Sequence, residues 1–82
     1  MTDGLRQRLA EIVSQATSGA VSVSEALAGQ SLRALGLDSL SALRLMDAID
    51  LEFGIEIEVG GSSTVDNLDD IVAAVAARVA PR

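Results

Sequence analysis

The sequence predicts an all-α fold, a small antiparallel bundle of three substantial helices joined by shorter pieces. Apolar residues recur at helical spacing in three stretches, and the one alternating stretch has no second strand to pair with. Phe53 is the only aromatic residue, so the core must be built from Leu, Val, Ile and Ala. Such a core favours closely packed helices. With 82 residues, the chain is expected to form one domain spanning residues 1–82.

The first helix is expected over residues 4–17. Its apolar stripe follows the spacing i, i+4, i+7, i+8, i+11 and consists of Leu5, Leu9, Ile12, Val13 and Ala16. Thr2 or Asp3 can cap its start, and Gly19 ends it.

About twenty residues without a strong period follow, which predicts a long first loop. Ser22 and Glu25 have the spacing of a capping box, so a short turn of helix over Val23–Leu27 is expected within it. Three leucines are too apolar to be left in water and should pack down over the bundle: Leu32, Leu35 and Leu37.

The second strong helix is expected over residues 39–53, with Gly54 as its C-terminal glycine. Its core face falls within one sector of the helical wheel and consists of Ala42, Leu45, Met46, Ile49 and Phe53. The opposite side holds Leu40, Leu43, Arg44, Asp47, Asp50 and Leu51.

Residues 54–59 alternate between apolar and acidic side chains. They are expected to form an extended connector that turns Ile55, Ile57 and Val59 inward, followed by a flexible turn at residues 60–63.

The last helix is expected to be capped by Thr64 or Asp66. Its apolar stripe consists of Leu68, Ile71, Val72, Val75 and Val79. Asp69 and Asp70 suit its first turn and Arg78 its last turn, because of the helix dipole, and Pro81 ends it.

The composition excludes several kinds of function. The chain has no Cys and no His, which excludes disulfides, Cys/His metal sites, a His base and a Cys nucleophile. Glu56 and Glu58 lack a third ligand or a catalytic partner, so no metal site and no catalytic residue is predicted. The double glycine Gly60-Gly61 is not a phosphate loop, because the lysine of that motif is missing.

The net charge of −6 disfavours nucleic acid and anionic lipid as partners and favours basic patches on proteins. No apolar run approaches the ~20 residues of a membrane span, and the first residues carry charges where a signal peptide is apolar. We therefore expect a complete, cytoplasmic and monomeric protein that does not bind a membrane.

The segment LGLDSL, residues 35–40, raises the question of what Ser39 does. A serine at a helix start usually caps the helix. Asp38, however, is an equally good cap, and Gly36 provides a turn that allows another molecule to approach closely. A helix N-terminus also stabilises the negative charge of a phosphoester, so Ser39 is either a cap or an attachment point. In the second case the Asp38 carboxylate is a nearby charge of the same sign as the phosphoester.

The outward side of the second helix offers a candidate partner surface beside this serine. Leu40 and Leu43 form an apolar patch with Asp47 and Asp50 at its rim, which suits a partner that is apolar in the centre and basic around it. The alternative is that the two leucines pack under the long loop.

The stretch LGLDSL, followed by SALRLMDAIDLEFGIEI, resembles the phosphopantetheine-attachment region of acyl and peptidyl carrier proteins. The resemblance extends through QSLRALG upstream and STVDNLDDIVAAV downstream. It implies a four-helix bundle with a long first loop and a short third helix. It also implies that a phosphopantetheinyl transferase attaches 4′-phosphopantetheine from coenzyme A to Ser39. Asp38 and Leu40 match the usual neighbours of that serine, and with Gly36 they complete the expected cofactor-binding set.

The resemblance implies a non-catalytic carrier whose helix at residues 39–53 meets partner enzymes, through Leu40, Leu43, Arg44, Asp47 and Asp50. GLDSL is the acyl-carrier form, whereas Arg44 resembles the peptidyl-carrier pattern, and Leu51 replaces an acid of fatty-acid carriers. The short piece between Ile57 and Thr64 predicts that the third helix is a single turn or absent.

These departures argue against primary fatty-acid synthesis and for a discrete carrier of polyketide or nonribosomal peptide assembly. The first expectation is a carrier that holds a polyketide-type acyl group as a thioester. The alternative is a peptidyl carrier holding an aminoacyl group in nonribosomal peptide assembly. Expected partners are an acyl-loading or adenylating enzyme and ketosynthase or condensation-type enzymes. A remote alternative is a helical interaction module without a prosthetic group.

Overall fold

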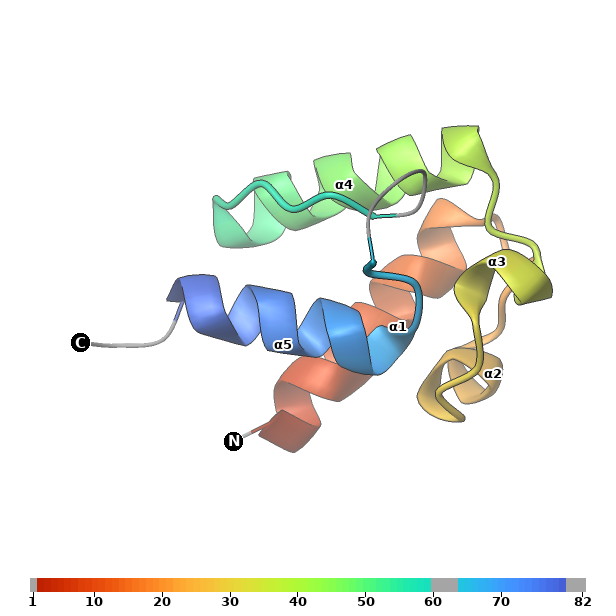
Figure 1. Cartoon of the computed structure of the whole chain (residues 1–82), viewed down its shortest axis with the longest axis horizontal. Coiled ribbons are helices and arrows are strands. Elements are labelled where there is room, and N and C mark those ends of the chain that lie inside the picture. Colours follow the sequence, from red (N-terminus) through yellow and green to blue (C-terminus); the bar gives the residue numbers. More distant parts are fainter. Residues whose placement is uncertain (1, 60–63, 80–82) are drawn as a thin grey trace.

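The computed structural model describes residues 2–59 and 64–79 and contains helices but no strand in those ranges. The helices are α1 (Thr2–Ala16), α2 (Val23–Leu27), α3 (Leu32–Leu35), α4 (Ser39–Phe53) and α5 (Leu68–Val79), as labelled in Figure 1. The predicted all-α class is therefore confirmed, with three long helices and two short ones in the described ranges.

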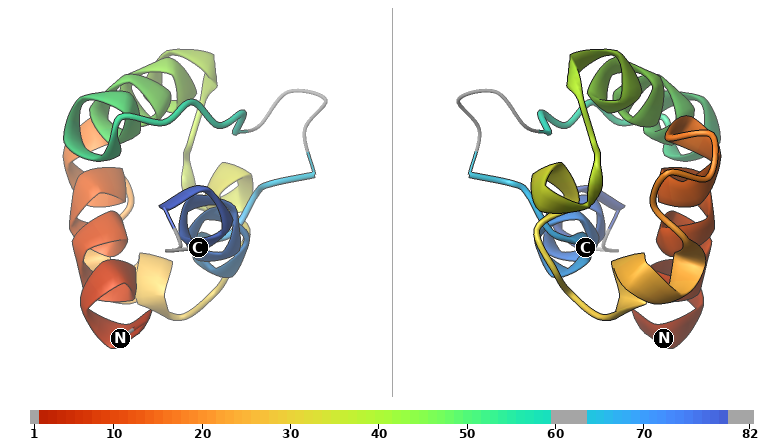
Figure 2. Two further views of the ribbon diagram at one scale, coloured as in Figure 1. Left: turned by 90° about the vertical axis from the view of Figure 1, so that its left-hand side faces the viewer. Right: turned by 90° about the vertical axis from the view of Figure 1, so that its right-hand side faces the viewer.

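Helix α1 organises the molecule, because α2, α4 and α5 all pack against it. Along the long axis in Figure 1, α4 and α5 run towards one end and α1 runs towards the other. Figure 2 shows the same arrangement along that axis, with α1 on one side and α4 across its end. The fully buried large side chains are Leu9, Ile12, Val13, Val21, Leu32, Leu45, Ile49, Leu68, Ile71 and Val75. Every described helix except α2 contributes at least one of them; α2 contributes the smaller Ala26.

The boundaries of α1 differ slightly from those predicted. The helix already includes Thr2, so neither Thr2 nor Asp3 precedes it as a cap, and that expectation was wrong. At the other end, Ser18 and Gly19 take positive φ values of 54° and 85°, and the Gly19 amide donates to the Ser14 carbonyl at 2.9 Å. Gly19 thus ends α1 as predicted.

The segment between α1 and α4 is more ordered than a long loop. Helix α2 has the predicted bounds, and Ser22 and Glu25 form the predicted capping box. Helix α3 was not predicted, because four residues are too few to show a helical period. Ser31 caps α3, and its hydroxyl donates to the carboxylate of Asp66, far along the chain.

Helix α4 has its predicted bounds and its predicted core face. Gly54 ends it in the left-handed conformation, with φ of 71°. Ala42, Leu45 and Ile49 are buried, and the half-buried Met46 and Phe53 pack against the core.

The connector after α4 is extended and leads away from α1 (Figure 2). Val59 is buried and the half-buried Ile55 and Ile57 pack against the core, which confirms the inward alternation. Residues 57–59 form no helix, and the predicted flexible turn at 60–63 lies outside the described residues, as does Pro81.

The residue that caps the start of α5 was predicted wrongly. The Asn67 side chain, rather than Thr64 or Asp66, accepts the hydrogen bond from the Asp70 amide at 2.8 Å. Asp66 is instead engaged with α3, where its carboxylate and carbonyl accept hydrogen bonds from the Arg33 and Leu32 amides at 3.3 and 2.9 Å. The acidic first turn of α5 and Arg78 in its last turn are as predicted.

Candidate functional site

The start of α4 is capped by Asp38. Its carboxylate accepts a hydrogen bond from the Ser41 amide at 2.8 Å, and its carbonyl accepts one from the Ala42 amide at 2.8 Å. The hydrogen bond from Ser41 lowers the pKa of Asp38 below its ordinary value, with a smaller contribution from Arg44. Asp38 is therefore anionic at neutral pH.

Ser39 is the first residue of α4 and lies exposed beside this cap. It is not the N-cap, so the capping interpretation of Ser39 was wrong. Its side chain forms no hydrogen bond with any residue in the described ranges. The hydroxyl therefore points to solvent with its donor and acceptor capacity unused by those residues.

Gly36 forms the turn that leads from α3 into this site. It ends α3 with φ of 127°, a conformation that L side chains rarely adopt. A Cβ atom added there would meet the Ala20 side chain at 3.7 Å, which is ordinary contact, so the backbone conformation rather than space requires glycine. The turn leaves Leu37 buried and Asp38 exposed.

The outward side of α4 is accessible, as the helical phase predicts. Leu40 and Leu43 are 57% and 61% exposed, so the alternative that they pack under the preceding loop is wrong. Arg44, Asp47 and Asp50 are also exposed. None of these three charged residues takes part in the ion pairs formed among the described residues.

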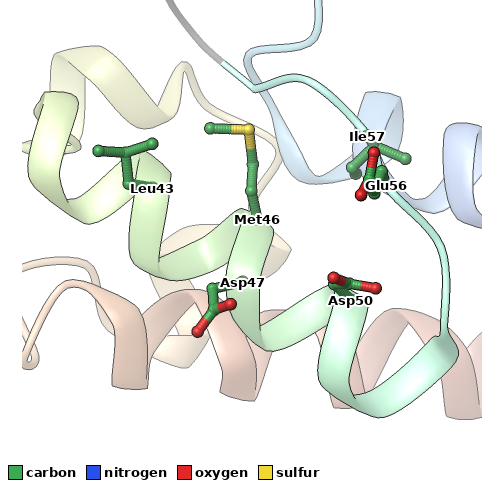
Figure 3. A pocket seen from close by; sticks show the side chains of 6 residues that line it. All are labelled: Leu43, Met46, Asp47, Asp50, Glu56 and Ile57. Atoms are coloured by element: carbon green, nitrogen blue, oxygen red, sulfur yellow. The ribbon is translucent and has the colours of Figure 1, made fainter.

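An open hollow of about 310 Å³ lies between α4 and the connector that follows it (Figure 3). Its lining combines apolar and acidic side chains: Leu43, Met46, Asp47, Asp50, Glu56 and Ile57. Glu56 and Ile57 come from the connector and lie across from the residues of α4. The alternation of residues 54–59 predicts that Ile57 points inward. It does not predict that Ile57 and Met46 line the same hollow, because the path of the connector over α4 depends on tertiary packing.

The described ranges contain neither a metal-binding cluster nor a membrane-spanning helix. No group of three or more His, Cys, Asp or Glu residues there is arranged to hold a metal ion. No helix in those ranges is long and apolar enough to cross a membrane.

Comparison with protein families assigns the chain. The family model for the phosphopantetheine attachment site matches residues 5–75, which include α4 and the segment before it. The chain belongs to this family of carrier proteins. The carrier bears a 4′-phosphopantetheine prosthetic group and is non-catalytic. Its partners therefore include a phosphopantetheinyl transferase and biosynthetic enzymes. Searches of curated proteins and of solved structures found no significant match to this carrier.

Proposed function

We propose that this carrier holds an acyl group of the polyketide type as a thioester on a 4′-phosphopantetheine arm attached to Ser39, and presents it to partner biosynthetic enzymes. The proposal rests on the observation that the helix cap and the exposed hydroxyl at the start of α4 belong to different residues. Asp38 caps the helix, and the exposed Ser39 hydroxyl is unengaged by the described residues.

The surroundings of Ser39 fit a phosphoester. The N-terminal end of α4 carries the positive end of the helix dipole, which stabilises an anion attached to its first residue. Asp38 is a neighbouring like charge, and its cap bond to Ser41 holds it on the helix end. The attached arm supplies a terminal thiol for the cargo, a group that a chain without cysteine does not otherwise have.

Two features bear on the cargo. The form GLDSL ahead of α4 favours an acyl group. Arg44, exposed on the outward side of the helix, supports the second candidate, a peptidyl carrier that holds an aminoacyl group in nonribosomal peptide assembly. Leu51, 82% exposed where fatty-acid carriers have an acid, supports a role outside primary fatty-acid synthesis for either candidate.

The outward side of α4 is the proposed meeting surface for partner enzymes. It presents Leu40, Leu43, Arg44, Asp47 and Asp50, all exposed. Two adjacent leucines with two carboxylates suit a partner surface that is apolar at its centre and basic at its rim. A long-range attraction to that basic surface follows from the net charge of −6.

The attachment site is tested by incubating the carrier with coenzyme A and a promiscuous phosphopantetheinyl transferase and measuring the intact mass. We expect a gain of one phosphopantetheine group in the wild type and none in Ser39→Ala. Ser41→Ala is the matched control, because it removes a serine hydroxyl from the same turn and leaves the backbone amide that Asp38 binds. A gain that persists in Ser39→Ala would place the arm elsewhere.

The cargo is tested by loading the carrier with candidate acyltransferases and candidate adenylating enzymes in parallel. Transfer of an acyl group with no aminoacylation supports the first candidate, and the opposite result supports the second.

A further inference from the structure

Four exposed side chains form a stripe along α4 on the side away from the core, and we call them the outer seam: Leu40, Arg44, Asp47 and Leu51. They follow the spacing i, i+4, i+7, i+11, which keeps side chains on one line along a helix and is the spacing of a coiled-coil seam. Leu51 is the most exposed large apolar residue of the described ranges, at 82%. Neither core packing nor attachment at Ser39 accounts for this exposure.

The outer seam has a symmetric order. Leu40 lies four residues before Arg44, and Leu51 lies four residues after Asp47, so the two ends are apolar and the two central charges have opposite signs. If a second copy of α4 is laid against the first in the antiparallel direction, a two-fold axis between Arg44 and Asp47 brings each leucine opposite the other leucine. The same operation brings each Arg44 opposite an Asp47.

We propose that two copies of this carrier associate through antiparallel pairing of their outer seams. Each end of the pair joins Leu40 of one copy to Leu51 of the other, and the middle holds two Arg44–Asp47 ion pairs. Both charged side chains are available for this, since neither takes part in the ion pairs among the described residues. The leucine contacts remove apolar surface from water, and the two ion pairs fix the antiparallel direction.

The size of the seam sets the strength of the association. One helix pair buries less than the roughly 1,200 Å² below which interfaces are weak and transient. The carrier is therefore a monomer in dilute solution and pairs at high concentration. Because Leu40 and Asp47 also belong to the proposed meeting surface for partner enzymes, pairing competes with their docking.

The charge pattern is tested by sedimentation equilibrium of the unmodified chain, up to millimolar concentration, so the outcome does not depend on whether Ser39 accepts the arm. We expect the wild type to approach twice the monomer mass. Arg44→Asp and Asp47→Arg should each weaken association by about tenfold or more, because each places like charges opposite one another. An equimolar mixture of the two variants should associate about as tightly as the wild type, since all facing charges are then opposite. The double reversal in one chain should do the same.

Net charge alone does not produce this pattern. Asp47→Arg makes the chain less acidic, so weaker general repulsion would strengthen its association rather than weaken it. Arg78→Asp is the matched control for Arg44→Asp, because it makes the same charge change at an exposed position on α5. It should associate as the wild type does. A wild type that stays monomeric at millimolar concentration, or single variants that associate normally, would overturn the proposal.

The direction of pairing is tested by cysteine crosslinking, which is unambiguous because the chain has no cysteine of its own. In the antiparallel pair, the two copies of residue 40 lie about 16 Å apart along the helix, too far for a disulfide. Under mild oxidation, Leu40→Cys mixed with Leu51→Cys should therefore give the crosslinked heterodimer, and either variant alone should give little. Efficient crosslinking of Leu40→Cys with itself would refute the antiparallel arrangement.

Discussion

At the scale of single residues, neighbouring side chains at the start of α4 have separate tasks. Asp38 accepts the Ser41 amide hydrogen bond at 2.8 Å and so satisfies a helix-end donor. Ser39 is left exposed, without a hydrogen bond to the described residues. A serine that also capped the helix would lose that cap on modification, whereas here the cap and the hydroxyl belong to different residues.

The lowered pKa of Asp38 predicts a pH-dependent contribution to stability. Asp38→Ala should lower the thermal midpoint at neutral pH, whereas Asp38→Asn, which keeps a capping oxygen, should lower it less. Because the folded-state pKa lies below the ordinary value of 3.8, the ionised carboxylate stabilises the fold above that value. This contribution is lost as the pH falls through the lowered pKa. Thermal unfolding followed by circular dichroism should show the wild type and Asp38→Asn converging in acid, whereas Asp38→Ala, which has no capping oxygen, stays lower at every pH. A constant difference between the wild type and Asp38→Asn would contradict the assignment.

Leu43 allows the outward surface to be tested apart from the fold. Since its side chain is 61% exposed, Leu43→Asp should change the free energy of unfolding by only about 0.5 kcal/mol and leave the helical circular dichroism unchanged. Transfer of cargo to partner enzymes should fall, because the substitution puts a charge in the apolar patch. Unfolding of this variant would show that Leu43 supports the core.

At the scale of elements, α4 has two different faces along its length, one packed against the core and one exposed. Leu45 and Ile49 are fully buried against the core, while Leu40 and Leu51 lie exposed on the opposite side. Whether a leucine of this helix is buried or exposed therefore depends on its angle about the helix axis.

This difference predicts unequal effects of the same substitution. Leu45→Ala should cost about 2–5 kcal/mol, comparable to the ~5 kcal/mol total of a marginal domain, because it removes buried methyl groups and leaves a cavity. Leu51→Ala should change stability by about 0.5 kcal/mol or less. Urea unfolding of both variants in dilute solution gives the comparison, and similar losses would show that the assigned helical phase is wrong.

Much of this architecture follows from local sequence, but α3 and the cap of α5 do not. The bounds of α2 and α4 and the core face of α4 were predicted from period and capping residues. Helix α3 was missed because its four residues are too few to show a helical period. The cap of α5 was missed because Asp66, which has the sequence signature of a local cap, hydrogen bonds to α3 instead. The position of Ser39 beside the cap was predicted as an alternative, whereas the hollow between α4 and the connector required the fold.

At the scale of the whole molecule, two arginines of α1 tie α2, α4 and α5 to it. Arg8 forms a two-pronged pair with Glu52 of α4, with nitrogen–oxygen distances of 2.6 Å. This pair raises the pKa of Arg8 and lowers that of Glu52. Arg6 donates to the Leu27 carbonyl of α2 at 2.6 Å and pairs with Asp69 of α5.

Arg6 is predicted to contribute more to the free energy of unfolding than other arginines, because its side chain joins α1 to α2 and α5. Arg6→Ala should cost about 1–3 kcal/mol, since it leaves the part-buried Leu27 carbonyl without its donor. Hydrogen exchange should become faster in α2 in particular. Arg78→Ala is the control, an exposed arginine of α5 that takes part in no ion pair among the described residues. Equal effects of the two substitutions would contradict the bridging role.

The contact between Asp66 and α3 has a consequence for the order in which the protein is made. During synthesis on the ribosome, α3 emerges well before Asp66, whose carboxylate and carbonyl accept hydrogen bonds from Ser31, Leu32 and Arg33. A nascent chain that ends at α4 therefore has α3 without its anchor, and Gly36 and Asp38 follow α3 directly. The approach to Ser39 therefore takes its final form only after Asp66 has been translated.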